Sequence, residues 1–153
     1  MADLLGGSMK FTVAAVVIAA ASAAFHSRVR ASQEPAARTT GSGIYSEAQA
    51  KRGEALYARA CAGCHGPDLS GEGQAPSLAG KDFATEWTDR SVGDLFERIR
   101  VSMPADAPGT LRPSEVADVL AFMLNKGSFP AGPVDLPVQL EALNTIKFPS
   151  GKP

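Results

Sequence analysis

The feature that most constrains this chain of 153 residues is the segment Cys61-Ala62-Gly63-Cys64-His65, which contains both of its cysteines and one of its two histidines. Thiols and imidazoles are reactive groups and metal ligands. The segment that follows, from Gly63 to Gly80, has five glycines and two prolines in eighteen residues and predicts a loop. A loop of that length in a small domain is expected where something organises it from inside, such as a bound cofactor.

Four chemistries use a pair of cysteines with this spacing. A disulfide and a thioredoxin-like dithiol need no histidine, and the dithiol belongs in a βαβ setting that this sequence lacks. A structural zinc ion needs four ligands, whereas the chain after its N-terminal segment offers only three thiolate or imidazole groups. The fourth use is covalent haem attachment by the pattern C-x-x-C-H.

Haem attachment gives a physical reason for the spacing of the two cysteines and the histidine. Two thiols three residues apart lie on about one helical turn, so they can reach the two vinyl groups on one edge of a flat macrocycle. The next residue is then carried over the ring face towards the iron. We therefore predict one haem c, bound covalently through Cys61 and Cys64, with His65 as an iron ligand.

A second iron ligand is expected to be a methionine, because His26 lies in or beside the predicted signal segment. Met123 falls on the apolar stripe of a predicted helix, where a core role is the simpler interpretation. Met103 precedes a proline in a non-helical segment, far enough beyond His65 to reach the other face of the ring. The sequence favours Met103, with simple loop packing as its alternative role.

Hydrophobic periodicity predicts helices over residues 46–60, 91–102 and 113–126. A capping pair precedes each of the first two, and a proline opens the third. Gly53 lies inside the first helix, where glycine costs about 1 kcal/mol relative to alanine, so we expect another backbone or a large side chain to approach it closely. No stretch alternates as strands do, and the predicted class is all-α with long loops.

The N-terminal residues differ from the rest in composition. Residues 11–25 carry no charge and have Lys10 before them, which predicts a secretory signal peptide within residues 1–31 and an exported, periplasmic protein. The alternatives are a retained membrane anchor, which would place the protein at the membrane, and a buried Ala-rich helix. Residues 32–43 have the composition of a linker.

The remaining chain divides into residues 44–127, the predicted domain, and residues 128–153, a tail that contains five prolines. The apolar residues of this tail either pack back on the domain or dock a partner. The net charge of −1 and the absence of a basic cluster argue against nucleic acid as a partner.

The segments GEALYARACAGCH, APSLAG, SMP and ADVLAFML, in this order, resemble the class I c-type cytochromes, most closely the bacterial monohaem kind. The resemblance implies the cytochrome c fold, three to four helices around one haem. In that family a glycine and an aromatic residue of the first helix cross an aliphatic and an aromatic residue of the last. Gly53 and Tyr57 match the first pair, and Val119 and Phe122 match the second.

The same resemblance assigns further site residues. The carbonyl group of Pro76 would accept a hydrogen bond from the ring of His65, which fixes a histidine ligand's tautomer. Met103 matches the family's second iron ligand, which also precedes a proline. Trp87 stands where related bacterial cytochromes often have a tryptophan near the haem propionates, although plain core packing explains it equally well. Apolar residues expected to bury the ring are Leu56, Leu78, Phe83, Leu95 and Phe96.

The function that this resemblance implies is electron transfer, with an iron that cycles between ferrous and ferric states. The protein would be a carrier rather than an enzyme, with redox proteins such as a dehydrogenase or a terminal oxidase as partners. The alternative is a haem enzyme or gas sensor in which Met103 is absent from the iron or easily displaced.

Overall fold

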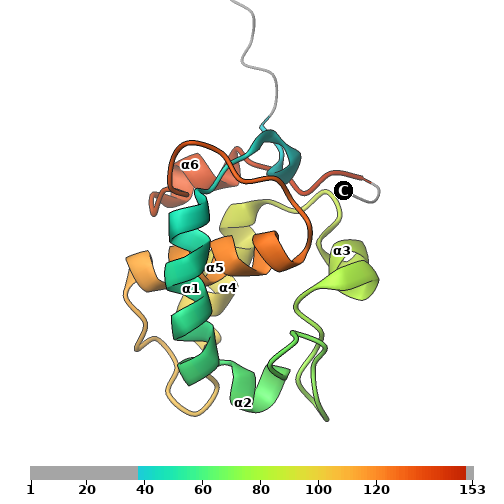
Figure 1. Ribbon diagram of the computed structural model, residues 1–153, viewed down its shortest axis with the longest axis vertical. Coiled ribbons are helices and arrows are strands. Elements are labelled where there is room, and N and C mark those ends of the chain that lie inside the picture. Colours follow the sequence, from blue (N-terminus) through green and yellow to red (C-terminus); the bar gives the residue numbers. More distant parts are fainter. Residues whose placement is uncertain (1–37, 151–153) are drawn as a thin grey trace, which may run out of the picture. The chain divides into compact units, whose positions relative to one another are not determined.

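Helices α1 (Glu47–Ala60) and α5 (Pro113–Lys126) cross each other at the centre of the structure, a computed structural model that describes residues 38–150 (Figure 1). Within these residues the secondary structure is helical, with isolated β-bridges only. Residues 38–150 are thus all-α, as predicted. The remaining helices are η1 (Thr40–Ser42), α2 (Ala62–His65), α3 (Gly80–Trp87), α4 (Val92–Ser102) and α6 (Leu140–Asn144).

The helix crossing depends on Gly53. A Cβ atom placed on this residue would lie 1.8 Å from the carbonyl oxygen of Asp118 in α5, so only glycine allows the two backbones to approach this closely. One turn further along α1, the Tyr57 ring packs against Phe122 with 5.2 Å between centroids. Val119, in the same helix as Phe122, is also buried. The close approach expected at Gly53 is confirmed.

Helix α4 begins and ends where its sequence signals predict. The Ser91 side chain accepts a hydrogen bond from the backbone N–H of Asp94, and the Asp94 carboxylate accepts one from the backbone N–H of Ser91. The apolar side of the helix buries Leu95 and Ile99. Met103 ends the helix with an extended backbone.

The sequence did not predict α3. Its N-cap is Ala79, which has no side chain to accept a hydrogen bond from the first turn, so the usual sequence signal for a helix start is missing. Burial of Phe83 and Trp87 against Phe148 stabilises this short helix instead.

The segment predicted as a tail is part of the core. Five of its apolar side chains are 6% exposed or less: Phe129, Leu136, Leu143, Ile146 and Phe148. Helix α6 packs against α4, and the N–H of Val92 donates to the carbonyl of Ile146 at 2.9 Å. Residues 38–150 lie in one compact unit, so residues 128–150 pack back on the domain, the first of the two expected alternatives.

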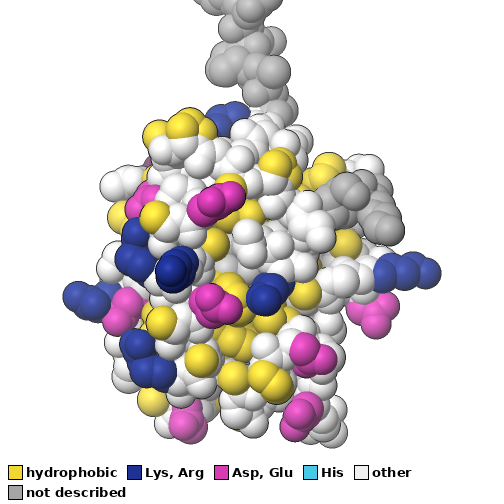
Figure 2. Space-filling view, viewed as in Figure 1, with side chains coloured by type: hydrophobic (Ala, Val, Ile, Leu, Met, Phe, Trp, Pro, Cys, Tyr) yellow, Lys and Arg dark blue, Asp and Glu magenta, His cyan; other side chains and the backbone are white. Residues whose placement is uncertain are grey.

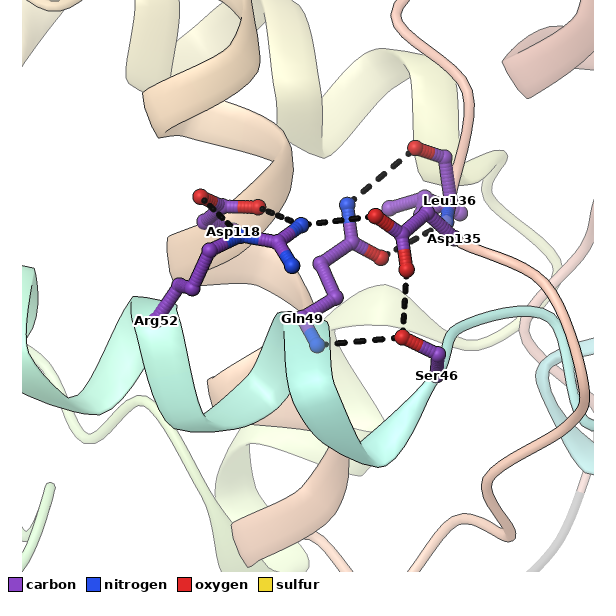
Figure 3. A network of polar contacts seen from close by, with 6 residues as sticks. All are labelled: Ser46, Gln49, Arg52, Asp118, Asp135 and Leu136. Carbon is purple, nitrogen blue, oxygen red and sulfur yellow. Dashed lines mark hydrogen bonds and ion pairs between the residues drawn. The ribbon is translucent and has the colours of Figure 1, made fainter.

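Polar contacts also link the segment after Gly127 to α1, and α1 to α5 (Figure 3). The Gln49 amide donates to the carbonyl of Leu136 at 3.2 Å and accepts from its N–H at 2.6 Å. The Ser46 side chain accepts a hydrogen bond from the N–H of Gln49, which is one half of a capping box. The other half would be a bond from the Gln49 side chain to the N–H of Ser46, but that side chain bonds to Leu136 instead. Arg52 pairs with both Asp118 and Asp135, at 3.0 and 2.7 Å.

Part of the predicted linker is also ordered. Thr40 lies in η1 and is buried, and its N–H donates to the carbonyl of Lys147 at 3.0 Å. The predicted signal segment, residues 1–31, lies outside the described residues. Between residues 38 and 150, none of the helices combines the length and the apolar character that crossing a membrane requires.

Candidate cofactor site

A cavity of about 810 Å³ brings together the residues predicted to bind the haem and its iron. Its lining includes Cys61, Cys64, His65, Pro76, Trp87 and Met103. These residues come from α2, α3, the end of α4 and the segment between α2 and α3. Figure 2 shows hydrophobic side chains gathered on the lower half of the visible face, where Figure 1 places α2.

Helix α2 positions the three residues of the motif. The backbone of Cys61 leaves the helical conformation, with φ −127° and ψ −36°, so the cysteine pair occupies a separate single turn rather than the end of α1. Cys61 is partly buried, Cys64 is exposed and His65 is 7% exposed. Both thiols are free. Burial raises the pKa of the Cys61 thiol to about 11, and the neighbouring Cys64 adds to the shift.

The ring of His65 has a defined orientation. Its Nδ1 atom lies 2.9 Å from the carbonyl oxygen of Pro76, as the family resemblance implies. A carbonyl oxygen can only accept a hydrogen bond, so Nδ1 carries the proton. In the neutral ring the lone pair is then on Nε2, the atom available to a metal.

Hydrogen bonds within the segment between α2 and α3 place Pro76. The N–H of Gly71 donates to the carbonyl of His65 at 2.9 Å, and the N–H of Leu78 donates to the carbonyl of Leu69, also at 2.9 Å. Gly71 has φ +81°, and a Cβ atom there would lie 2.5 Å from the carbonyl oxygen of Ala75. The segment predicted as an irregular loop is therefore held by its own backbone next to the histidine.

Tyr57 supports the motif from α1. Its hydroxyl group donates to the carbonyl of Gly66, directly after His65, at 2.7 Å. Burial raises the pKa of this phenol to about 12, with smaller effects of Cys61 and Asp68. The C-x-x-C-H motif does not predict this hydrogen bond between Tyr57 and Gly66.

Both candidate methionines line the cavity. Met103 is partly buried, and its N–H donates to the carbonyl of Ile99 at 2.9 Å, which anchors it to the last turn of α4. Met123 is 2% exposed, in keeping with its predicted core position, yet it also reaches the cavity wall.

The apolar wall differs in part from the expected one. Leu78 and Leu95 line the cavity, together with Ile99 and Val119. The other three residues expected to bury the ring are buried elsewhere in the core: Leu56, Phe83 and Phe96. Helical periodicity identifies a buried face, but it does not tell which part of the core that face meets.

The site fits a haem better than a bare metal ion. Within the described part of the chain, no three His, Cys, Asp or Glu side chains converge as the ligands of a metal ion must. By contrast, two thiols on one turn, a histidine with Nε2 free and a methionine surround one apolar cavity. Its volume is in the range of small-molecule and cofactor sites, about 300–1,000 Å³. Soft sulfur and imidazole ligands also suit iron in a macrocycle.

Comparisons with known proteins agree with this donor set. The family described as "Cytochrome C oxidase, cbb3-type, subunit III" matches residues 48–123. Cytochrome c-551 of Bacillus subtilis (strain 168) is 30% identical over 87 residues, which are 57% of this chain and 72% of that protein.

Among solved structures, a chain of the sulfane dehydrogenase SoxCD from Paracoccus pantotrophus aligns with a TM-score of 0.49 and 24% identity. The alignment covers 72% of this chain and 58% of that one.

Membership therefore follows from the sequence relationship rather than from this structural likeness. The identity with cytochrome c-551 extends over more than two thirds of that protein, and the family match over residues 48–123 includes the cysteine motif. Proteins of this family bind haem c covalently, act in electron transfer and are usually exported. The chain belongs to the c-type cytochromes.

Proposed function

We propose that this protein is an electron carrier with one haem c. The thiols of Cys61 and Cys64 would form the two thioether bonds, and His65 and Met103 would bind the iron. The observation that carries the proposal is that one cavity collects all four residues while Pro76 engages Nδ1 of His65 and leaves Nε2 available.

When bound, haem c supplies one-electron chemistry, because its iron alternates between the ferrous and ferric states. The residues of this chain would bind the haem and set its reduction potential. Pro76 fixes the tautomer and orientation of His65, which strengthens the histidine as a ligand. The thioether of Met103 favours the ferrous state and so raises the reduction potential. The apolar wall of Leu78, Leu95 and Val119 excludes water, with the same effect on the potential.

Two protein ligands leave the iron no position for a substrate. The protein would therefore pass electrons between partners and perform no reaction of its own. A haem enzyme or gas sensor requires an open or easily opened position, so the state of Met103 separates the two functions.

The partners that fit this role are redox proteins, with a dehydrogenase as donor or a terminal oxidase as acceptor. The matching family takes its printed name from an oxidase subunit, which supports the second of these. Export of the c-type cytochromes, together with the uncharged residues 11–25, supports a periplasmic location. Attachment to the membrane would follow only if residues 1–31 are retained as an anchor.

Substitution of Met103 tests the proposal. In protein matured with its haem, Met103→Ala should change the visible absorption spectrum and lower the midpoint potential, because the thioether that stabilises ferrous iron is lost. Met123→Leu is the matched control, since Met123 lines the same cavity but has no ligand role in the proposal. It should keep the wild-type spectrum.

Haem-stained denaturing gels of both variants establish that covalent attachment is intact. If Met103→Ala keeps the wild-type spectrum and potential while its haem remains attached, the carrier with two protein ligands is wrong. The same result would favour the haem enzyme or sensor. A colourless wild-type protein would refute haem binding altogether.

A further inference from the structure

The cavity has two arginines in its lining, Arg59 and Arg98, and they differ in what holds them. Arg59 lies two residues before Cys61, and its guanidinium donates to the carbonyl of Ala55 in its own helix at 3.3 Å. The guanidinium of Arg98 makes no hydrogen bond or ion pair with any residue from 38 to 150. Four other arginines are engaged: Arg52, Arg100 and Arg112 in ion pairs and Arg90 over the ring of Trp87.

The position of Arg98 on α4 brings it to the cavity. It lies three residues after Leu95 and directly before Ile99, two buried residues that line the cavity wall. Arg98 itself is exposed and also lines the cavity, a combination that is typical of a long charged side chain beside an apolar wall. Arg100, two residues later, bonds to Glu97 at 2.6 and 2.8 Å and does not line the cavity.

A haem adds two carboxylates to this site. They project from the edge of the macrocycle opposite the vinyl groups that bond to the cysteines. A carboxylate that loses water on binding needs a charged hydrogen-bond donor in exchange, and arginine offers two parallel N–H groups that match it. The acidic side chains of the lining, Glu72, Glu86 and Asp106, can only repel it.

We infer that Arg98 binds a haem carboxylate and so helps to set the reduction potential. The inference rests on the proposed function, because it needs the haem edge that Cys61 and Cys64 would fix. Arg59 lies at the cysteine edge and is already bonded to its own helix, whereas Arg98 comes from α4 and has its full donor capacity unused. A guanidinium on a haem carboxylate cancels the negative charge nearest to the iron, which disfavours the ferric state.

The test uses the full chain with its haem attached, as Arg98→Gln, Arg98→Lys and the matched control Arg100→Gln. Two quantities are measured: the midpoint potential and the resonance Raman bands of the carboxylate bending vibrations. Arg98→Gln should shift the midpoint potential downward and move a carboxylate band. Arg98→Lys should keep most of the potential, since it keeps the charge, but should still move the band because lysine lacks the planar fork. Arg100→Gln should match the wild type in both.

Three results would overturn the inference. In the first, Arg98→Gln and Arg100→Gln behave alike. In the second, the potential falls while the Raman bands stay in place, which means that Arg98 acts through its charge alone. In the third, Arg98→Gln changes the absorption bands that report the iron ligands, which gives Arg98 a different role.

A different experiment shows whether the proposed function fails. If it does, the spectrum of Met103→Ala stays as in the wild type, and this result does not depend on either arginine. The Arg98 inference can therefore fail in a protein that remains a haem carrier with both iron ligands in place.

Discussion

At the scale of single residues, Tyr57 connects the helix crossing to the cofactor site. Its ring packs on Phe122 of α5, and its hydroxyl group donates to the carbonyl of Gly66 beside His65. Because the side chain is 2% exposed, water cannot replace this hydrogen bond if it is lost. Tyr57 thus contributes both to stability and to the placement of the histidine.

The substitution Tyr57→Phe should lower the free energy of unfolding by about 1 kcal/mol, the net worth of one buried hydrogen bond, because the Gly66 carbonyl still accepts from the N–H of Leu69 at 3.3 Å. It should also change the response to alkali. The pKa of Tyr57 is raised by burial from 10.0 to about 12, so between these values the unfolded chain loses this proton while the folded chain keeps it. Stability is therefore complete below pH 10.0 and falls as the pH rises to about 12.

Urea unfolding at a series of pH values measures both effects. Tyr57→Phe should flatten the alkaline fall but not remove it, because burial also raises the pKa of Tyr45. An alkaline profile that is as steep in Tyr57→Phe as in the wild type would contradict the assignment to Tyr57.

At the scale of helices, the contact of α1 with α5 leaves no room for a side chain at Gly53. Gly53→Ala gains about 1 kcal/mol in helix propensity. The new Cβ, however, would stand 1.8 Å from the backbone oxygen of Asp118, which cannot move unless α5 moves. Overpacking of this kind costs about 1–3 kcal/mol or more, so the net effect should be destabilising.

Thermal or urea unfolding of Gly53→Ala checks this expectation. Gly41→Ala is the control, because a Cβ at Gly41 would meet its nearest neighbour, the Thr39 hydroxyl, at an ordinary 3.4 Å. A Gly53→Ala protein that is as stable as the wild type would show that the two helices can separate freely.

Local signals decide which helices could be predicted from the sequence. The bounds of α4 and α5 were predictable because their caps lie next to them in the chain: Ser91 with Asp94, and Pro113 at the first turn. Helix α3 lacks a cap, and Gln49 bonds to Leu136 rather than to its own helix terminus. Contacts between distant residues decided both cases, and periodicity carries no information about them.

At the scale of the whole molecule, residues 128–150 complete the core that α1, α4 and α5 begin. Phe148 is 2% exposed and packs against the rings of Phe83, Trp87 and Phe129 at about 6 Å. Phe148→Ala should therefore cost about 3–5 kcal/mol, as expected for a large aromatic side chain removed from a core.

The control for Phe148→Ala comes from the same segment. Val138 is 37% exposed, and Val138→Ala should change stability by no more than about 0.5 kcal/mol. Both are measured by thermal unfolding. If the two substitutions had equal, small effects, residues 128–150 would be an appendage rather than part of the core.

The residues of the site differ in what was needed to predict them. Cys61, Cys64 and His65 follow from a local motif, and Pro76, Trp87 and Met103 required the resemblance to a family. Arg98 required the structure, because its importance lies in being the arginine at the cavity that no described residue engages. Nothing in the sequence around Arg98 separates it from Arg100.

The two ends of this compact unit meet. Lys147 donates its N–H to the carbonyl of Arg38 at 2.9 Å and accepts at 3.0 Å from the N–H of Thr40. In Figure 1, η1 and α6 lie at one end of the view and α2, with the cysteine motif, at the other. A unit that the chain enters and leaves at one point can be inserted into a loop of another protein with little disturbance to that host. This unit is therefore suited to insertion into larger polypeptides, with the connections at the end remote from the cysteine motif.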